Sequence, residues 1–230
     1  SDILHNRVAI CEEVNKRCRP LEHFPHYLQQ GYYPFGAEGF ATYNQRVENT
    51  IELLLNIELP QLRKVDIGNI RKLKALLSVL ASEVPMLVDT AKLSTLLGIS
   101  RNTLLAYLEY LDEAKLIKRL YSDDLSVKKM QKPDKILMDN CNLLKVLALK
   151  EPNIGTLRET FFCNQLGYQH QVEYSKQGDF LIDHQITFEI GGQTKEGKQV
   201  AAIEDAYIVA DDIEYSCGNK LPIWLFGLLY

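Results

Sequence analysis

The sequence lacks the cysteine pattern of a metal-binding or disulfide-stabilised protein. Its five cysteines, Cys11, Cys18, Cys141, Cys163 and Cys217, are odd in number and widely scattered, and no two form a C-x-x-C pair. This spacing excludes the common zinc motifs and the redox dithiols. We therefore predict reduced thiols, most of them buried.

Long apolar runs are also missing. No stretch approaches the 18 or so apolar residues of a membrane-spanning helix. The first residues, SDILHNRVAICEEV, lack the basic start and apolar centre of a signal peptide. We expect a cytoplasmic protein with no membrane partner.

An excess of basic charge is the third absence. The chain has 26 Lys and Arg against 30 Asp and Glu, a net charge of −4. This balance argues against a protein whose whole surface binds nucleic acid, although a local basic patch remains open. With 230 residues, 46% of them hydrophobic, the chain is long enough for two modest domains. We expect these at residues 1–130 and 131–230.

Residues 89–121 contain the clearest local pattern. Asp89 or Thr90 is expected to cap a helix over residues 90–97, in which Leu93, Leu96 and Leu97 share a face, and Gly98 ends it. Ser100 then caps a second helix with leucines at positions 104, 105, 108 and 111. Two short helices joined by a glycine-containing turn predict a helix-turn-helix. The strand-like residues 116–121 extend it to a winged helix at about residues 89–130.

A winged helix suggests DNA binding, and Arg101, Asn102 and Thr103 at the start of the second helix are the candidates for base contact. Lys128, Lys129 and Lys132 form the densest basic cluster and are the candidates for phosphate contact. Against this, the second helix carries Glu109, Asp112 and Glu113, which repel phosphates. We therefore prefer a packing or hinge module for the winged helix and a solvated loop for the lysines.

The rest of the first half is predicted to be helical. The expected helices cover residues 3–17, 21–30, 40–56 and 66–84. Pro60 is placed just beyond the third helix, and Asp66 is the expected cap of the fourth. The aromatic turn at residues 31–36 is interpreted as packing anchors rather than as a base-stacking platform, because no basic cluster accompanies it.

The period changes in the second half. A strand at residues 135–138, a helix at 139–149 and a helix from residue 154 or 156 to residue 166 come first. Strands follow at 171–174, 179–182, 186–190 and 206–209. The apolar run at residues 221–226 must be buried. The fold class is therefore α+β: a helical array that ends in a winged helix, followed by a small α/β domain.

Three acids of the second half are candidates for chemistry: Glu159, Asp179 and Glu189. An acid inside an apolar strand, such as Glu189, is costly unless it is paired or binds a cation. Carboxylates on paired strands are one way to hold Mg²⁺ for phosphodiester hydrolysis. The alternative is that Glu189 lies near a sheet edge and bonds Lys195, Lys198 or Thr194.

Residues 192–198, GQTKEGK, have the spacing of a phosphate-binding loop, but Gln199 stands where a hydroxyl would hold Mg²⁺ and no helical pattern follows. We interpret this match as chance. We also identify no apolar strand ending in the acidic pair that such an ATPase needs. The chain by itself is therefore expected not to bind ATP.

The order of several segments resembles the C-terminal region of bacterial and archaeal AAA-type ATPases that carry an uncharacterised domain behind their motor. These segments are YLQQGYYP, GISRNTLLAYLEYLDEAKLIKRL, KILMDN, GTLRETFF, GDFLI, FEIGG and PIWLFGLLY. The resemblance covers most of the chain. It implies a winged helix after the ATPase lid and then a domain similar to the restriction-endonuclease fold, in which Glu159, Asp179 and Glu189 match the acids of the metal site.

The sequence departs from that pattern at Gly191, where the catalytic lysine of an E-x-K motif would stand. Lys195 is the first basic residue available, and on an extended chain it would lie about 20 Å from Glu189 at ~3.3 Å per residue. Unless a turn returns it, the site lacks a positioned cation. The resemblance therefore implies a degenerate acidic cluster that does not cut, with a weak Mg²⁺ or Mn²⁺ site at Asp179 and Glu189.

We interpret the chain as the accessory region of an AAA-type ATPase, with no catalytic activity of its own. Its partners would be the ATPase domain that the resemblance places before it and a further protein or nucleic acid, and ATP and Mg²⁺ would be cofactors of the full-length protein only. The alternatives are a metal-dependent nuclease and a winged-helix DNA-binding regulator. The oligomeric state and the physiological process stay open.

Overall fold

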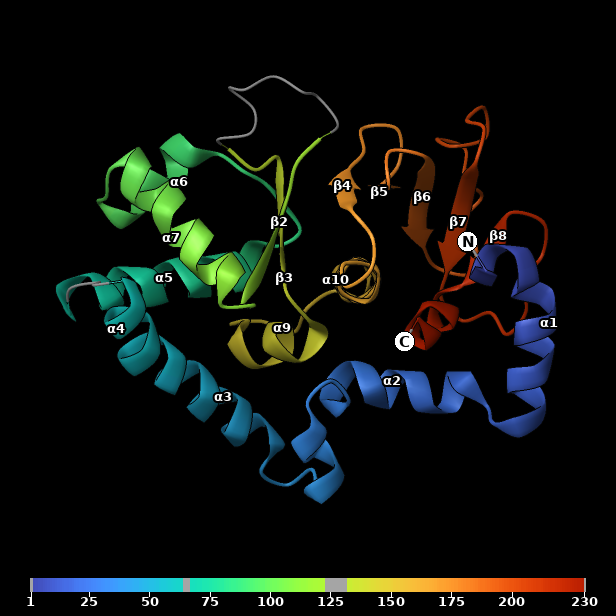
Figure 1. Cartoon of the computed structure of the whole chain (residues 1–230), viewed down its shortest axis with the longest axis horizontal. Coiled ribbons are helices and arrows are strands. Elements are labelled where there is room, and N and C mark those ends of the chain that lie inside the picture. The colour runs from blue at the N-terminus through green and yellow to red at the C-terminus, as the bar shows by residue number, and fades with distance from the viewer. Residues whose placement is uncertain (1, 64–66, 123–131, 230) are drawn as a thin grey trace. The chain divides into compact units, whose positions relative to one another are not determined.

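The computed structural model describes residues 2–63, 67–122 and 132–229 (Figure 1). The chain is of mixed α+β type, with a helical N-terminal part and two sheets. It forms two compact units. The central unit comprises residues 29–152, and the terminal unit combines residues 1–28 with residues 153–230.

The expected domain boundary near residue 130 stays a prediction, and the compact units divide the chain elsewhere. β3 (Lys135–Met138) pairs with both β1 (Met86–Leu87) and β2 (Ile117–Leu120). α9 (Cys141–Leu147) contacts α3 (Tyr43–Leu53) and α5 (Ile67–Glu83). Strand pairing and helix packing therefore tie residues 132–152 to the helices that precede them.

The central unit contains helices around a three-stranded antiparallel sheet of order β1-β3-β2. Its remaining elements are η1 (Pro34–Glu38), η2 (Leu54–Glu58), α4 (Leu59–Arg63), α6 (Thr90–Leu97) and α7 (Arg101–Glu113). In chain order, α5, β1, α6, α7, β2 and β3 follow one another, and α7 packs beside β2 (Figure 1).

The predicted caps of α6 and α7 are confirmed. The Asp89 side chain accepts hydrogen bonds from the backbone amides of Ala91 and Lys92, both at 3.0 Å. Gly98 ends α6 in the left-handed region, with φ 59° and ψ 44°. The Ser100 hydroxyl accepts from the Thr103 amide at 3.1 Å. Local side-chain chemistry thus sets both helix starts.

Two expectations about helices were wrong. The third helix does not end before Pro60, because α3, the π-helical η2 and α4 run on to Arg63. Pro60 is the second residue of α4 and comes two residues after the end of the π-helical turn η2. Leu96 was placed on the apolar face of α6, yet it is 63% exposed. The expected Asp66 cap lies outside the described residues.

The aromatic turn packs as predicted. The rings of Tyr33 and Phe35 stack with centroids 5.4 Å apart, and the Phe35 ring lies 5.1 Å from that of Tyr43. The Tyr43 hydroxyl also bonds the Asn142 side chain. These rings pack against one another, as expected for packing anchors rather than for a base-stacking platform.

The terminal unit is built on a five-stranded sheet. Its strands are β4 (Val172–Tyr174), β5 (Phe180–Ile182), β6 (Ile186–Gly191), β7 (Ala206–Ala210) and β8 (Lys220–Pro222), side by side in that order (Figure 1). β4, β5 and β6 are antiparallel neighbours, whereas β6, β7 and β8 run parallel. The helices are α1 (Asp2–Arg17), most of α2 (Pro20–Gln30), α10 (Ile154–Leu166) and η3 (Ile223–Leu228).

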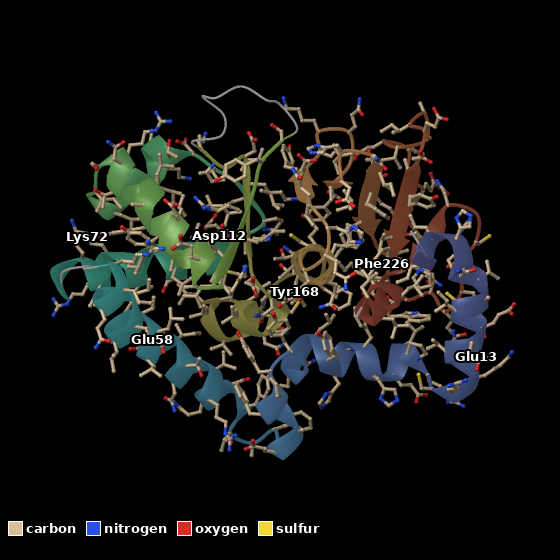
Figure 2. All side chains as sticks on the ribbon, in the orientation of Figure 1. Glu13, Glu58, Lys72, Asp112, Tyr168 and Phe226 are labelled. Carbon is tan, nitrogen blue, oxygen red and sulfur yellow. The ribbon has the colours of Figure 1, made fainter. Side chains whose placement is uncertain are left out.

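The core of this unit lies between the sheet and α10. The Phe162 ring of α10 lies 5.0 Å from Phe188 of β6, 5.4 Å from Phe180 of β5 and 4.8 Å from Phe226 of η3, which Figure 2 labels. Side chains alternate along a strand. Phe188 therefore faces α10, and its neighbour Glu189 faces the other side of the sheet.

Candidate functional site

Glu189 lies in β6, the middle strand of the terminal unit's sheet. It is only 2% exposed. The alternative of a position near a sheet edge is therefore wrong, although its other half, a bond to Lys195, is found. A carboxylate buried in a central strand needs a counter-charge, because desolvation of the charged form is costly.

Lys195 supplies that counter-charge. Its Nζ lies 2.8 Å from Oε1 of Glu189. A turn at residues 192–195, closed by a 3.0 Å bond from the Lys195 amide to the Gly192 carbonyl, returns the chain toward the strand. The sequence left open that a turn would return Lys195, and the structure contains that turn, so the separation of about 20 Å for an extended chain does not apply. The ammonium group of Lys195 is therefore a cation held next to Glu189.

The loop that carries Lys195 is held in place by Lys220 of β8. Lys220 Nζ donates to the carbonyl oxygens of Gln193, at 2.5 Å, and Lys195, at 2.9 Å. A pocket of about 430 Å³ opens in this loop and is lined by Glu189, Gly192 and residues 194–199. The Oε2 atom of Glu189 is buried and has no hydrogen-bond partner among the residues that the structure describes. An unsatisfied buried acceptor of this kind is costly unless a ligand or water completes it.

Asp179 lies beside Glu189. Phe180 of β5 pairs with Phe188 of β6, so the register carried one residue further sets Asp179 opposite Glu189. The Asp179 amide donates to the Phe188 carbonyl at 2.9 Å, and its Oδ2 accepts from the Ile190 amide at 2.6 Å. Opposite residues of antiparallel strands place their side chains on one face. The structure therefore brings these two predicted acids together.

Glu159 does not join them in a three-acid cluster. It belongs to α10, which covers the Phe188 face of the sheet rather than the Glu189 face. Within the described ranges, no group of three or more His, Cys, Asp or Glu residues is placed to hold a metal ion. Two neighbouring carboxylates with an unpartnered oxygen fit a divalent cation that keeps several waters.

A second buried ion pair lies at the carboxyl ends of β6 and β7, and the sequence did not indicate it. Arg158 Nε donates to Asp211 Oδ2 at 3.1 Å, and the Asp211 amide donates to the Gly191 carbonyl at 3.1 Å. Asp211 and Asp212 follow the apolar strand β7 directly. The statement that no apolar strand ends in an acidic pair was therefore wrong, but Asp211 is engaged by Arg158.

The phosphate-loop match at residues 192–198 has no helix behind it. Residues 198–205 form turns and bends and lead into β7. In a phosphate-binding loop the anion sits at a helix N-terminus. The interpretation of this match as chance is thus supported by the local structure.

The DNA-contact candidates lie in the central unit. Arg101 and Asn102 are exposed at the start of α7, whereas Thr103 is half-buried and takes part in the Ser100 cap. Lys132 is half-buried, and Lys128 and Lys129 lie outside the described residues. Of the four candidates that the structure describes, Arg101 and Asn102 are therefore the two that are exposed for contact with DNA.

Three cations near α7, namely Arg119, Arg63 and Lys72, bond other groups of the protein. Arg119 Nε donates to Oδ2 of Asp112 at 3.0 Å. Arg63 pairs with Glu113, and Lys72 Nζ donates to the Gly98 carbonyl at 3.0 Å. Figure 2 labels Lys72 and Asp112 on α5 and α7. Cations paired with carboxylates release few counterions from DNA, so the basic footprint of α7 is weak.

An apolar groove of about 310 Å³ lies between α5 and α6. Its lining is Ser78, Val79, Ser82, Glu83, Met86, Asp89, Lys92, Leu93, Leu96 and Leu149. Two of these side chains, Leu96 and Leu149, are 63% and 81% exposed. Exposed leucines beside a groove are typical of a protein-contact surface.

The structure has no helix, over the described parts of the chain, with the length and apolar character needed to cross a membrane. Comparison with curated proteins and with solved structures gave no match. A family model described as "Domain of unknown function (DUF8612)" matches residues 21–153, which is more than half of the chain and includes the whole central unit but not Glu189. The chain belongs to the DUF8612 family.

Proposed function

We propose that this chain is an accessory region of an AAA-type ATPase that engages a protein partner through its central unit. The order and pairing of α5, β1, α6, α7, β2 and β3 support the proposal that this part of the central unit is a winged helix, as the resemblance implies. α10, the antiparallel β4-β5-β6 meander and the parallel β7 and β8 support the proposal of an endonuclease-like terminal unit.

The observation that carries the proposal is the contrast between two surfaces of the central unit. Two of the cations beside α7, Arg119 and Arg63, are paired with Asp112 and Glu113. The groove between α5 and α6 instead presents exposed leucines. Apolar surface drives association between proteins, whereas phosphate binding needs unpaired cations.

The partner to test first is the ATPase motor that the resemblance implies. A purified motor domain should bind the chain, and Leu96→Lys in the groove should weaken that complex about tenfold or more, the effect of a lost hot-spot contact. Leu62→Lys is the matched control, because Leu62 is an exposed leucine of α4 that does not line the groove. Equal loss in both variants would contradict docking in the groove.

A DNA assay separates this function from that of a regulator. Fluorescence anisotropy should show weak, sequence-independent binding that disappears at moderate salt. Sequence-selective nanomolar binding at physiological salt, abolished by Arg101→Ala, would instead establish the winged-helix DNA reader.

A metal-dependent nuclease is the second candidate, favoured by the Lys195–Glu189 ion pair. The expectation of no cleavage stays a prediction, but its argument from Gly191 no longer holds because Lys195 reaches the site. Asp179 and Glu189 would hold a Mg²⁺ or Mn²⁺ ion, which would polarise the phosphodiester as a Lewis acid. Lys195 would then offer positive charge to the negative charge that develops on phosphate.

Labelled single- and double-stranded DNA and RNA, incubated with the chain in Mn²⁺, test this candidate. Intact substrates are the result expected for an accessory region. Metal-dependent cleavage that Asp179→Ala abolishes would place the nuclease first.

A further inference from the structure

Gly191 ends β6 two residues after Glu189, and its backbone does not require glycine. The described glycines with positive φ are Gly39, Gly98, Gly197 and Gly218. Gly191 is not among them and pairs with Ala210 in the parallel ladder. Any L-residue adopts such a strand conformation. The reason for a glycine must therefore be space.

That space is filled by Lys195. A Cβ atom on Gly191 would lie 2.7 Å from Cγ of Lys195 and 2.8 Å from both its Cβ and its Cδ. Carbon atoms pack at about 3.5–4.0 Å, so these positions overlap. Residues i and i+2 of a strand share a face. The stem of Lys195 thus lies where a side chain at residue 191 would start, on the Glu189 side of the sheet.

The buried carboxylate explains why Lys195 takes this route. Glu189 is almost fully buried, and its charge partner among the described residues is Lys195, whose Nζ lies 2.8 Å from Oε1. The ammonium holds Oε1, while Oε2 stays without a partner in a residue that lines the loop pocket. One lysine therefore neutralises the acid and fixes which oxygen is left for a ligand.

We infer that Gly191 and Lys195 act as a pair in which Lys195 lies over the bare backbone of Gly191 and supplies the cation that a lysine at residue 191 would supply. Lys195 is a positioning residue that acts through Glu189. The ligand class is a divalent cation bound by Oε2 of Glu189 and by Asp179, with which the Lys195 ammonium competes. The pair itself stands on packing and charge, and only its cation ligand rests on the second candidate function.

The test is a set of variants of the full chain, followed by thermal unfolding and by calorimetric titration with Mn²⁺. Lys195→Ala should lower the Tm of the terminal unit by about 4 °C or more, because it leaves a buried charge unpaired. Gly191→Ala should lower Tm in the wild-type background and have little effect in the Lys195→Ala background, because the overlapping stem is gone.

The decisive variant is the double substitution Gly191→Lys with Lys195→Ala, which moves the lysine from residue 195 to residue 191; we call it the relocation variant. It should recover at least half of the Tm lost in Lys195→Ala. Lys198→Ala is the matched control, since Lys198 lines the same pocket, is exposed and pairs with Glu196. This control should leave Tm unchanged. The inferred pair would be overturned if Gly191→Ala lowered Tm equally in both backgrounds, or if the relocation variant recovered none of the lost Tm.

Mn²⁺ affinity distinguishes positioning from a purely structural role. Lys195→Ala should bind Mn²⁺ about tenfold more tightly than the wild type, because the competing ammonium is removed, and relocation should reverse this gain. Unchanged or weaker binding in Lys195→Ala would overturn the assigned competition. Absence of Mn²⁺ binding in every variant would refute the cation ligand and the second candidate function, and the Tm coupling would then decide the pair alone.

Discussion

Gly197 allows the loop that carries Lys195 to pack against β7, and its replacement by alanine should be costly for two separate reasons. Its φ is +64°, a region that L-residues avoid. A Cβ at this position would also lie 2.3 Å from Cδ1 and 2.6 Å from Cγ1 of Ile208. Ile208 is buried in a small cluster with Val200 and Ala206, so it has little room to move.

The two costs can be separated by a second glycine of the same unit. Left-handed backbone costs an L-residue about 1–2 kcal/mol, and overpacking adds about 1–3 kcal/mol. Gly197→Ala should therefore lower the free energy of unfolding by about 2–5 kcal/mol. Gly218 has φ +60° but nothing within 4 Å of its Cβ position, so Gly218→Ala should show the backbone cost alone.

Urea unfolding followed by fluorescence is a suitable assay. The single tryptophan, Trp224, is buried in η3 of the terminal unit and reports on it. The difference between the two variants should shrink in an Ile208→Ala background, since the overlapping atoms are removed. Equal destabilisation by Gly197→Ala and Gly218→Ala would refute the packing argument.

Three further predictions concern Asp139, Ser100 and the binding of ATP. Burial raises the pKa of Asp139 from 3.8 to about 6. The folded state therefore binds this proton more tightly, and the free energy of unfolding falls as pH rises from about 4 to 6. Asp139→Asn should flatten that decline in urea midpoints measured across the window. Ser100→Ala should destabilise the central unit by about 1 kcal/mol by removing the α7 cap, measured by chemical unfolding. Calorimetric titration of the chain with ATP should show no saturable micromolar binding, because the loop at residues 192–198 leads into turns rather than a helix.

Features that depend on neighbouring residues could be predicted from the sequence. The start and end of α6 and the start of α7 follow from Asp89, Gly98 and Ser100, because a cap bonds amides within three residues of itself. The strands around Glu189 were also located, because apolar runs between turn residues predict strands. The expectation that Asp179 and Glu189 meet came from the resemblance, and their register in β5 and β6 places them side by side.

Features that depend on residues far away in the sequence could not be predicted from the sequence. β1 is only two residues long and exists because β3, some 50 residues later, pairs with it. The placement of Pro60 inside a helical run depends on a π-helical turn that no local pattern indicates. The exposure of Leu96 depends on whether another segment covers α6, and helical spacing alone carries no such information.

The sequence by itself determined which residues are candidates. These are Glu189 in an apolar strand, Asp179 at the start of the strand before it, and Gly191 where the resemblance leads one to expect a lysine. Only the tertiary structure decided what that glycine means. A turn over residues 192–195 and the hydrogen bonds from Lys220 return Lys195 to the strand. Its ammonium then reaches Glu189. The physical reason is that a buried carboxylate requires a cation in space, and the number of residues that separates the two along the chain does not restrict which cation can supply it.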